Sequence, residues 1–171
     1  GTGQTDQSYN GGNLTTYMGG IVLKDDGSTM LIGSMAGTLN DFVIQYDLGT
    51  AFTIDSNVTV SSSSSDNLDV NPPEILIGGL SVAGGGTKVY TFGRSSNEVN
   101  RFDLTTAWDL STGGSAVSSF NTSSQISNVY DGHMKDDGTE MYVVGYHPDN
   151  VYRYTLSTAN NLSTASLTNT L

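Results

Sequence analysis

The stretch "DGTEMYVVGYHPDNVYRYTL", residues 137–156, joins an apolar run to a second run of alternating aromatic residues through a polar turn. Alternation with a period of two over β-branched and aromatic residues is typical of a half-buried antiparallel strand. The Asp-Gly pair that opens the stretch favours a tight hairpin, because glycine accepts positive φ and aspartate tolerates turn geometry. The stretch therefore predicts two antiparallel strands that follow a hairpin turn.

The same pattern occurs three times along the chain. A hairpin glycine, an alternating strand and a Leu-x-x-Ala step recur at a spacing of about 50 to 60 residues, which is the period of propeller blades rather than of helical solenoids. Each copy can be divided into four strands. The recurring positions are Gly27, Gly86 and Gly138; Leu48, Leu104 and Leu156; and Ala51, Ala107 and Ala159.

This repeat predicts an all-β, β-propeller-like fold with three four-stranded antiparallel blades. The blades are expected at about residues 16–60, 74–120 and 126–171, after an N-terminal extension at residues 1–15. Residues 61–73 are rich in serine and end in two prolines. They are interpreted as a loop between the first two blades, because the repeat resumes directly after them.

Glycine pairs open the innermost strand of the first two copies, as Gly19-Gly20 and Gly78-Gly79. Innermost strands crowd around the axis of a propeller, where the absence of a side chain permits close approach of two backbones. We therefore interpret these glycines as steric accommodations. The outermost strands are expected near Val58–Val60, Ala116–Phe120 and Ser166–Leu167.

The strings "DGTEMYVVG" (137–145) and "NVYRYTLSTANNLSTA" (150–165), with "RFDLTTAWDLST" (101–112) in the middle copy, are similar to a known repeat. They resemble the blade repeat of β-propeller segments in marine phage structural proteins and in bacterial surface proteins. The resemblance covers about residues 16 to 171. It implies a rigid scaffold on a virion surface or in the extracellular space.

Three blades are fewer than a closed propeller contains, which is usually four to eight. An open arc exposes strand edges and apolar blade faces, which favours association. We therefore expect other protein subunits to complete the arc, either as a homo-oligomer, for which two chains and six blades are the simplest case, or as virion neighbours. A longer chain that supplies the missing blades, or an open assembly stabilised by its neighbours, is also consistent with the sequence.

The charge of the chain restricts its partners. Seventeen acidic residues stand against six Lys and Arg, so the formal net charge is −11. A field of this sign repels phosphate backbones, which argues against nucleic-acid binding. The sequence has no apolar span near twenty residues, so membrane insertion is not expected either. The absence of cysteine excludes disulfides and thiolate zinc sites.

Candidate ligand-binding residues lie in a polar loop and at the single tryptophan. The loop "GYHPDN", residues 145–150, combines Tyr146, His147 and Asp149. An aromatic ring, an imidazole and a carboxylate in one loop could bind a ligand, although a solvated turn is the favoured interpretation. Trp108 is either an exposed stacking platform for a carbohydrate or a packing residue between blades, and the matching Phe52 favours packing.

The sequence offers no catalytic constellation. The acidic pairs Asp25-Asp26 and Asp136-Asp137 precede turn glycines at equivalent positions, which favours turn chemistry over acid–base catalysis. His133 and His147 are the only imidazoles, and no set of residues has the spacing of metal ligands. We therefore predict no catalytic residues, no metal and no cofactor.

These observations favour a non-enzymatic structural or recognition module of a virion, such as a tail, fibre or capsid decoration protein. Rigid loops of such a module could contact host-surface glycans. A secreted bacterial adhesin or lectin-like propeller is the first alternative. A fragment of a hydrolytic propeller enzyme is the second, and it predicts carboxylates or a metal clustered at the central axis.

Overall fold

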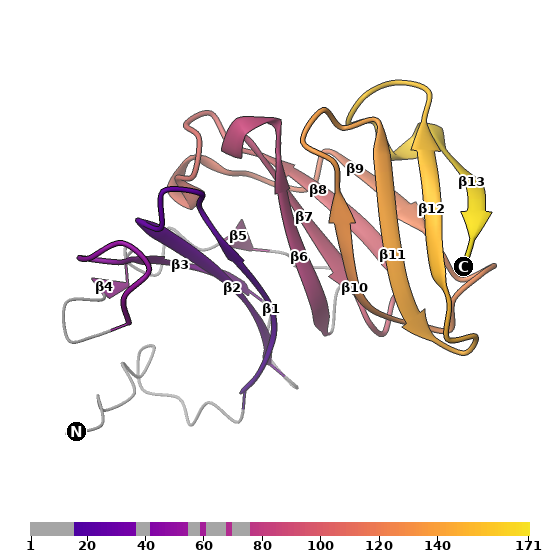
Figure 1. Ribbon diagram of the computed structural model, residues 1–171, viewed down its shortest axis with the longest axis horizontal. Coiled ribbons are helices and arrows are strands. Elements are labelled where there is room, and N and C mark those ends of the chain that lie inside the picture. Colours follow the sequence, from indigo (N-terminus) through magenta and orange to yellow (C-terminus); the bar gives the residue numbers. More distant parts are fainter. Residues whose placement is uncertain (1–15, 37–41, 55–58, 61–67, 70–75) are drawn as a thin grey trace.

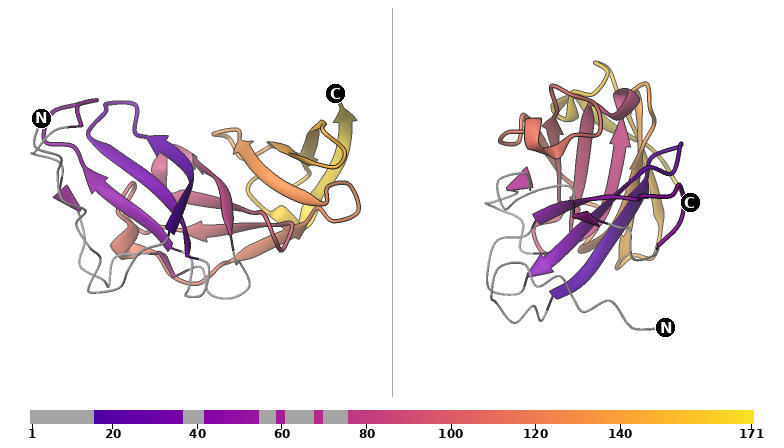
Figure 2. Two further views of the ribbon diagram at one scale, coloured as in Figure 1. Left: turned by 90° about the horizontal axis from the view of Figure 1, so that it is seen from below. Right: turned by 90° about the vertical axis from the view of Figure 1, so that its left-hand side faces the viewer.

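The computed structural model describes residues 16–36, 42–54, 59–60, 68–69 and 76–171. These residues form three antiparallel sheets that follow one another along an arc (Figures 1 and 2). We call the sheets blade 1, blade 2 and blade 3 in chain order. The predicted all-β, propeller-like fold is confirmed. The predicted N-terminal extension, residues 1–15, lies outside the described residues.

Each blade is built from strands in simple sequential order. Hairpins join neighbouring strands, so the sheet order follows the chain order. Blade 2 contains β6 (Ile77–Ala83), β7 (Lys88–Gly93), β8 (Glu98–Asp103) and β9 (Ser118–Asn121). Blade 3 contains β10 (Asn128–Met134), β11 (Glu140–Tyr146), β12 (Val151–Leu156) and β13 (Ala165–Thr170).

Blade 1 departs from four strands. It contains β1 (Thr16–Leu23), β2 (Thr29–Ala36), β3 (Phe42–Asp47), β4 (Thr59–Val60) and β5 (Leu68–Asp69). Both β4 and β5 pair with β3, at opposite ends of that strand, so the outermost position is divided between two short strands. Leu68 and Asp69, which the sequence placed in the loop at residues 61–73, are therefore strand residues. The rest of that predicted loop lies outside the described residues.

The innermost strands of the three blades lie side by side. The strand β6 packs against β1 on one side and against β10 on the other (Figure 1). Glycine is required at this contact: a Cβ atom at Gly20 would lie 2.6 Å from the backbone nitrogen of Leu80, and one at Gly78 would lie 2.8 Å from the backbone oxygen of Tyr130. The predicted close approach of the inner backbones is confirmed.

Two apolar cores lie between successive blades. The first joins Leu31 and Val43 of blade 1 to residues of blade 2, and the second joins Tyr90, Phe92 and Val99 of blade 2 to blade 3. Since burial of apolar area is the main stabilising contribution, each blade depends on its neighbour for stability. The blade 2 residues of the first core are Ile77, Leu80, Val89, Phe102, Leu104 and Leu110; the blade 3 residues of the second are Ile126, Val129, Met134, Met141, Val143, Tyr152, Tyr154, Leu156 and Leu162.

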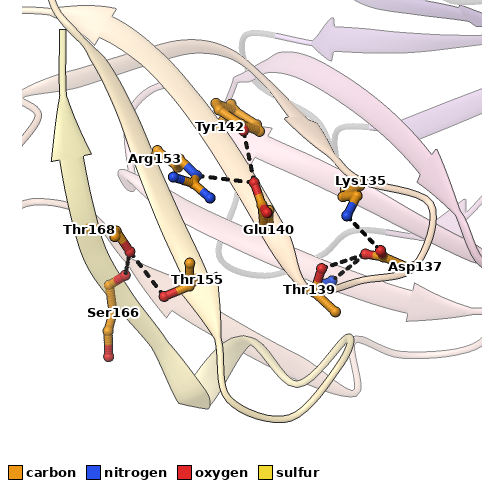
Figure 3. A network of polar contacts seen from close by, with 9 residues as sticks. All are labelled: Lys135, Asp137, Thr139, Glu140, Tyr142, Arg153, Thr155, Ser166 and Thr168. Atoms are coloured by element: carbon orange, nitrogen blue, oxygen red, sulfur yellow. Dashed lines mark hydrogen bonds and ion pairs between the residues drawn. The ribbon is translucent and has the colours of Figure 1, made fainter.

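The second aspartate of each acidic pair, Asp26 and Asp137, has the turn role that the sequence predicted. Asp26 Oδ1 accepts hydrogen bonds from the backbone N–H and the hydroxyl of Ser28, at 2.9 and 2.6 Å, and Asp26 pairs with Lys24 at 2.8 Å. These hydrogen bonds, from Lys24 first and then from Ser28, lower the pKa of Asp26 to about 2. Asp137 makes the same set of bonds in blade 3, and its pKa is also lowered to about 2. Figure 3 shows this turn with Lys135 and Thr139.

A second structural feature, which recurs in all three blades, follows the third strand of each blade. Phe52, Trp108 and Asn160 occupy equivalent positions, and all three have positive φ, between 56° and 62°. Each donates its backbone N–H to the carbonyl oxygen of the turn glycine of its own blade, at 2.8 to 3.0 Å. In blades 2 and 3 a short 3-10 helix follows, at Leu110–Thr112 and Leu162–Thr164, and is capped by the side chains of Asp109 and Asn161. The repeat is therefore held together by one recurrent set of backbone bonds.

Candidate ligand-binding surface

A bulge in β10 displays Tyr130 at the surface. The pairing of β10 with β11 shifts register between Val129 and Asp131, so Tyr130 is the extra residue. Val129 is buried in the core between blades 2 and 3, whereas Tyr130 points outward. Bulges re-aim side chains in this way because the extra residue leaves the alternation of the strand. The bulge thus provides an exposed phenol ring at the junction of two blades.

Arg94 and Tyr146 flank this ring. The guanidinium of Arg94, which follows β7, lies 4.7 Å from the centroid of the Tyr130 ring and donates a hydrogen bond to the Tyr130 hydroxyl at 3.3 Å. The Tyr146 ring, at the end of β11, lies 6.4 Å from the Tyr130 ring, centroid to centroid, with an interplanar angle of 58°. Tyr130 and Tyr146 are 41% and 45% exposed. Two aromatic rings and one cation therefore share an open surface.

His147 extends the same surface. Its imidazole centroid lies 3.8 Å from that of Tyr146, at an interplanar angle of 54°. His147 has a φ of 52°, a left-handed conformation that places its side chain beside the preceding ring. We call Arg94, Tyr130, Tyr146 and His147 the tyrosine platform.

The structure separates the residues that the sequence singled out. Tyr146 and His147 are brought together, and Asp149 is exposed in the same loop two residues further on. Trp108 lies at the opposite end of the blades, beside the hairpin turn of blade 2: a Cβ atom at Gly86 would collide with its indole. Trp108 is half-buried and packs against the core between blades 1 and 2, so it is not part of the platform.

The platform has the chemistry of a stacking site. Tyrosine rings offer flat apolar faces with a hydroxyl group at the rim, and aromatic residues of this kind contribute large contact area at low entropic cost. Arg94 adds N–H donors in a planar fork, which suit hydroxyl and carboxylate oxygens. Among the described residues, no three His, Asp or Glu side chains are grouped so as to hold a metal ion. The surface is suited to a ligand with flat apolar faces and polar edges.

Sequence reasoning missed Tyr130 and Arg94. Tyr130 is separated from Tyr146 by a full strand pair, and only the bulge and the register of β10 with β11 bring the two rings together. Arg94 belongs to another blade and reaches Tyr130 because Gly78 lets the two inner strands approach. Of these two residues, only Tyr130 could have been noticed in the sequence. It is an aromatic residue directly after Val129, and this breaks the apolar–polar alternation expected of a strand.

Comparisons with known proteins bear on the fold. No family model and no curated protein matches the chain. Among solved structures, a candidate 6-phosphogluconolactonase from Bacteroides fragilis is 13% identical, with a TM-score of 0.64 over 91% of this chain and 42% of that one. The β-propeller domain of Cps50 (Swd1) from Myceliophteria thermophila is 12% identical, with a TM-score of 0.55 over 91% of this chain and 43% of that one.

The fold is propeller-like. A functionally unknown protein from Desulfotomaculum acetoxidans also matches, at 12% identity and a TM-score of 0.59, over 90% of this chain and 41% of that one. The three blades thus span less than half the length of these structures. In the described part of the chain, no helix has the length and apolar character needed to cross a membrane.

Proposed function

We propose that this chain is a non-enzymatic recognition module that binds surface glycans through the tyrosine platform. The observation that carries the proposal is the pair of exposed rings, Tyr130 and Tyr146, which lie 6.4 Å apart with Arg94 stacked on one of them. Sugar rings have flat C–H faces that stack on aromatic side chains, and their hydroxyl groups accept hydrogen bonds from an arginine. A non-catalytic role is further supported by Asp26 and Asp137, whose carboxylates are engaged in hairpin turns.

The resemblance of the repeat supports a place on the surface of a virion, as a tail, fibre or capsid decoration protein. In that setting the three blades form a rigid scaffold, and the tyrosine platform at one end of the blades binds the glycan. The same surface would serve a secreted bacterial adhesin, which is the alternative. Mass spectrometry of purified particles separates the two, since the virion role requires the chain to be a stoichiometric component of the particle.

The glycan proposal is tested by binding measurements on the intact chain. A glycan array identifies a ligand, and isothermal titration calorimetry then gives its dissociation constant. We expect Tyr130→Ala and Tyr146→Ala each to raise that constant about tenfold, because each removes one stacking ring.

A matched control lies on the same strand as Tyr130. His133 is exposed on β10 outside the platform, and His133→Ala should leave the dissociation constant unchanged. An array without any bound glycan, or tyrosine variants that bind like the unsubstituted protein, would overturn the proposal.

A further inference from the structure

Every blade has two different faces. Cross-strand partners in a sheet point to the same side, so the registers assign the faces directly. In blade 2, Val82, Val89 and Phe102 are partners and face blade 1, whereas Ser81, Tyr90 and Arg101 are partners and face blade 3. We call the side turned toward the preceding blade the front face and the side turned toward the following blade the rear face. Among the described residues, each of the two cores is formed by a rear face and a front face.

The front face of blade 1 carries apolar residues that its counterparts bury. Counted from the turn glycine and the Leu-x-x-Ala step, Ile54 is equivalent to Leu110 and Leu162. Leu110 and Leu162 are buried against the preceding blade, with exposed fractions of 2% and 0%, whereas Ile54 is 75% exposed. Leu23 and Ile21 are also exposed; Met134, the counterpart of Leu23, and Leu80, the counterpart of Ile21, are buried in the inter-blade cores.

The rear face of blade 3 carries the same residue types that blade 2 uses to contact the blade after it. Tyr142 and Arg153 are equivalent to Tyr90 and Arg101 of blade 2. There, the Tyr90 hydroxyl donates to Asn160 Oδ1 at 2.9 Å, and Arg101 donates to the Asn160 carbonyl oxygen. Both contacts join blade 2 to blade 3.

On blade 3 the same two side chains are held in place without a following blade. Glu140 Oε2 accepts from the Tyr142 hydroxyl at 2.8 Å and from Arg153 Nε at 3.0 Å (Figure 3). The Arg153 bond, followed by the Tyr142 bond, lowers the pKa of Glu140. In blade 2 a carboxylate orients the arginine in a similar way, since Asp103 Oδ1 lies 3.0 Å from Arg101 Nε. Glu140 therefore holds both side chains on the rear face of blade 3, including the Tyr142 hydroxyl, whose counterpart in blade 2 bonds to the next blade.

We propose that the front face of blade 1 docks on the rear face of blade 3 of a second copy of this chain, and reciprocally, so that two copies close a six-bladed ring. The ring repeats the two interfaces already present in each chain. Phe52, which is equivalent to Asn160 and exposed, then lies against Tyr142 and Arg153 of the other copy. Its ring offers a cation–π partner for Arg153, and its carbonyl oxygen offers the acceptor that Asn160 provides to Arg101. Six blades lie within the range of closed propellers.

The proposal rests on the contacts between blades and not on glycan binding, so it is tested without any ligand. It predicts a dimer of about 36 kDa, twice the 18.0 kDa of the chain, in size-exclusion chromatography with light scattering. Ile54→Glu on the front face and Arg153→Glu on the rear face should each raise the dimer dissociation constant about 100-fold or more, because each variant damages both interfaces of the ring. Both side chains lie at the surface, and circular dichroism checks that the variants remain folded.

Mixing the two variants is the decisive measurement. A ring formed from one Ile54→Glu copy and one Arg153→Glu copy contains one doubly substituted interface and one without substitutions. We therefore expect two variants that are monomeric alone to form a mixed dimer when combined. Val117→Glu changes an exposed apolar residue of blade 2 outside the two faces of the proposed contact, and it should leave dimerisation unchanged.

Several results would overturn the proposal. A monomer at all accessible concentrations would show that the front face of blade 1 is left free or is covered by residues of its own chain. Head-to-tail polymers would exclude the closed ring. A dimer that persists in the Ile54→Glu variant, or variants that fail to complement each other, would place the contact between copies on another surface.

Discussion

At the scale of residues, Gly138 and Asn160 form a contact that allows only glycine at one partner. Gly138 has a φ of 71°, and a Cβ atom there would collide with the side-chain amide of Asn160. Asn160 in turn has positive φ and donates its N–H to the Gly138 carbonyl oxygen at 2.8 Å. The same arrangement recurs at Gly27 with Phe52 and at Gly86 with Trp108, so this contact links the hairpin to the third loop of each blade.

Gly138→Ala should therefore destabilise the protein by about 1–3 kcal/mol, because it combines an unfavourable φ with a steric conflict. Gly114→Ala is the matched control, since a Cβ atom at Gly114 meets no other atom within 4 Å. Urea unfolding followed by circular dichroism measures both free energies of unfolding. Equal stability of the two variants would contradict the role assigned to Gly138.

At the scale of elements, the hydrogen bond between Gln45 and Leu110 fixes blade 1 on blade 2. Gln45 is buried on β3, and its Oε1 accepts the backbone N–H of Leu110 at 3.0 Å. Leu110 begins the 3-10 helix of blade 2 and has no intrahelical acceptor for this N–H. The side chain of one blade thus satisfies a buried backbone donor of the next.

Gln45→Leu keeps the volume but removes the acceptor, so we expect a loss of about 1–3 kcal/mol from the buried donor that is left unpaired. Amide hydrogen exchange locates the effect. Exchange should accelerate at Leu110 and in strands β1 to β3, while strands β11 and β12 of blade 3 serve as the internal control. Uniform acceleration through all three blades would show that the bond stabilises the whole chain and not this one interface.

Local pattern and long-range register explain what the sequence could and could not predict. The hairpins and the third strands were predictable, because Asp137-Gly138 and the alternating run at residues 151–154 carry their own turn and strand signals. The division of the outermost strand of blade 1 was not, since two-residue strands such as Leu68–Asp69 depend on pairing with β3 and have no periodicity. The tyrosine platform was half predictable: Tyr146 and His147 were singled out from the sequence, but Tyr130 reaches them only through a bulge.

At the scale of the whole molecule, charge opposes the proposed ring while apolar contact favours it. Each chain carries a formal charge of −11, so two copies repel one another. The interface between blades 2 and 3 indicates which acidic residues would meet in the ring. There, the backbone oxygen of Asp136 accepts the N–H of Gly84 and its Oδ1 accepts the N–H of Gly85, both at 3.0 Å. Asp25 is the equivalent of Asp136, and in the ring it would meet Asp136 and Asp137 of the second copy in place of the two glycines.

Dimerisation should therefore strengthen with salt. Raising the ionic strength from about 0.01 M to about 0.15 M shortens the Debye length from roughly 30 Å to roughly 8 Å, which screens the repulsion between the chains but leaves apolar contact intact. Asp25→Asn removes one charge at the interface, and we expect it to lower the dimer dissociation constant about two- to fivefold at low salt and to weaken the salt dependence.

Asp149→Asn removes the same charge at the opposite end of the blades and should change the dimer dissociation constant less. Analytical ultracentrifugation at several salt concentrations measures all three proteins. A dimer that weakens as salt is added would show that attraction between charged groups dominates the interface. In that case the apolar front face of blade 1 would not be the surface that joins the two copies.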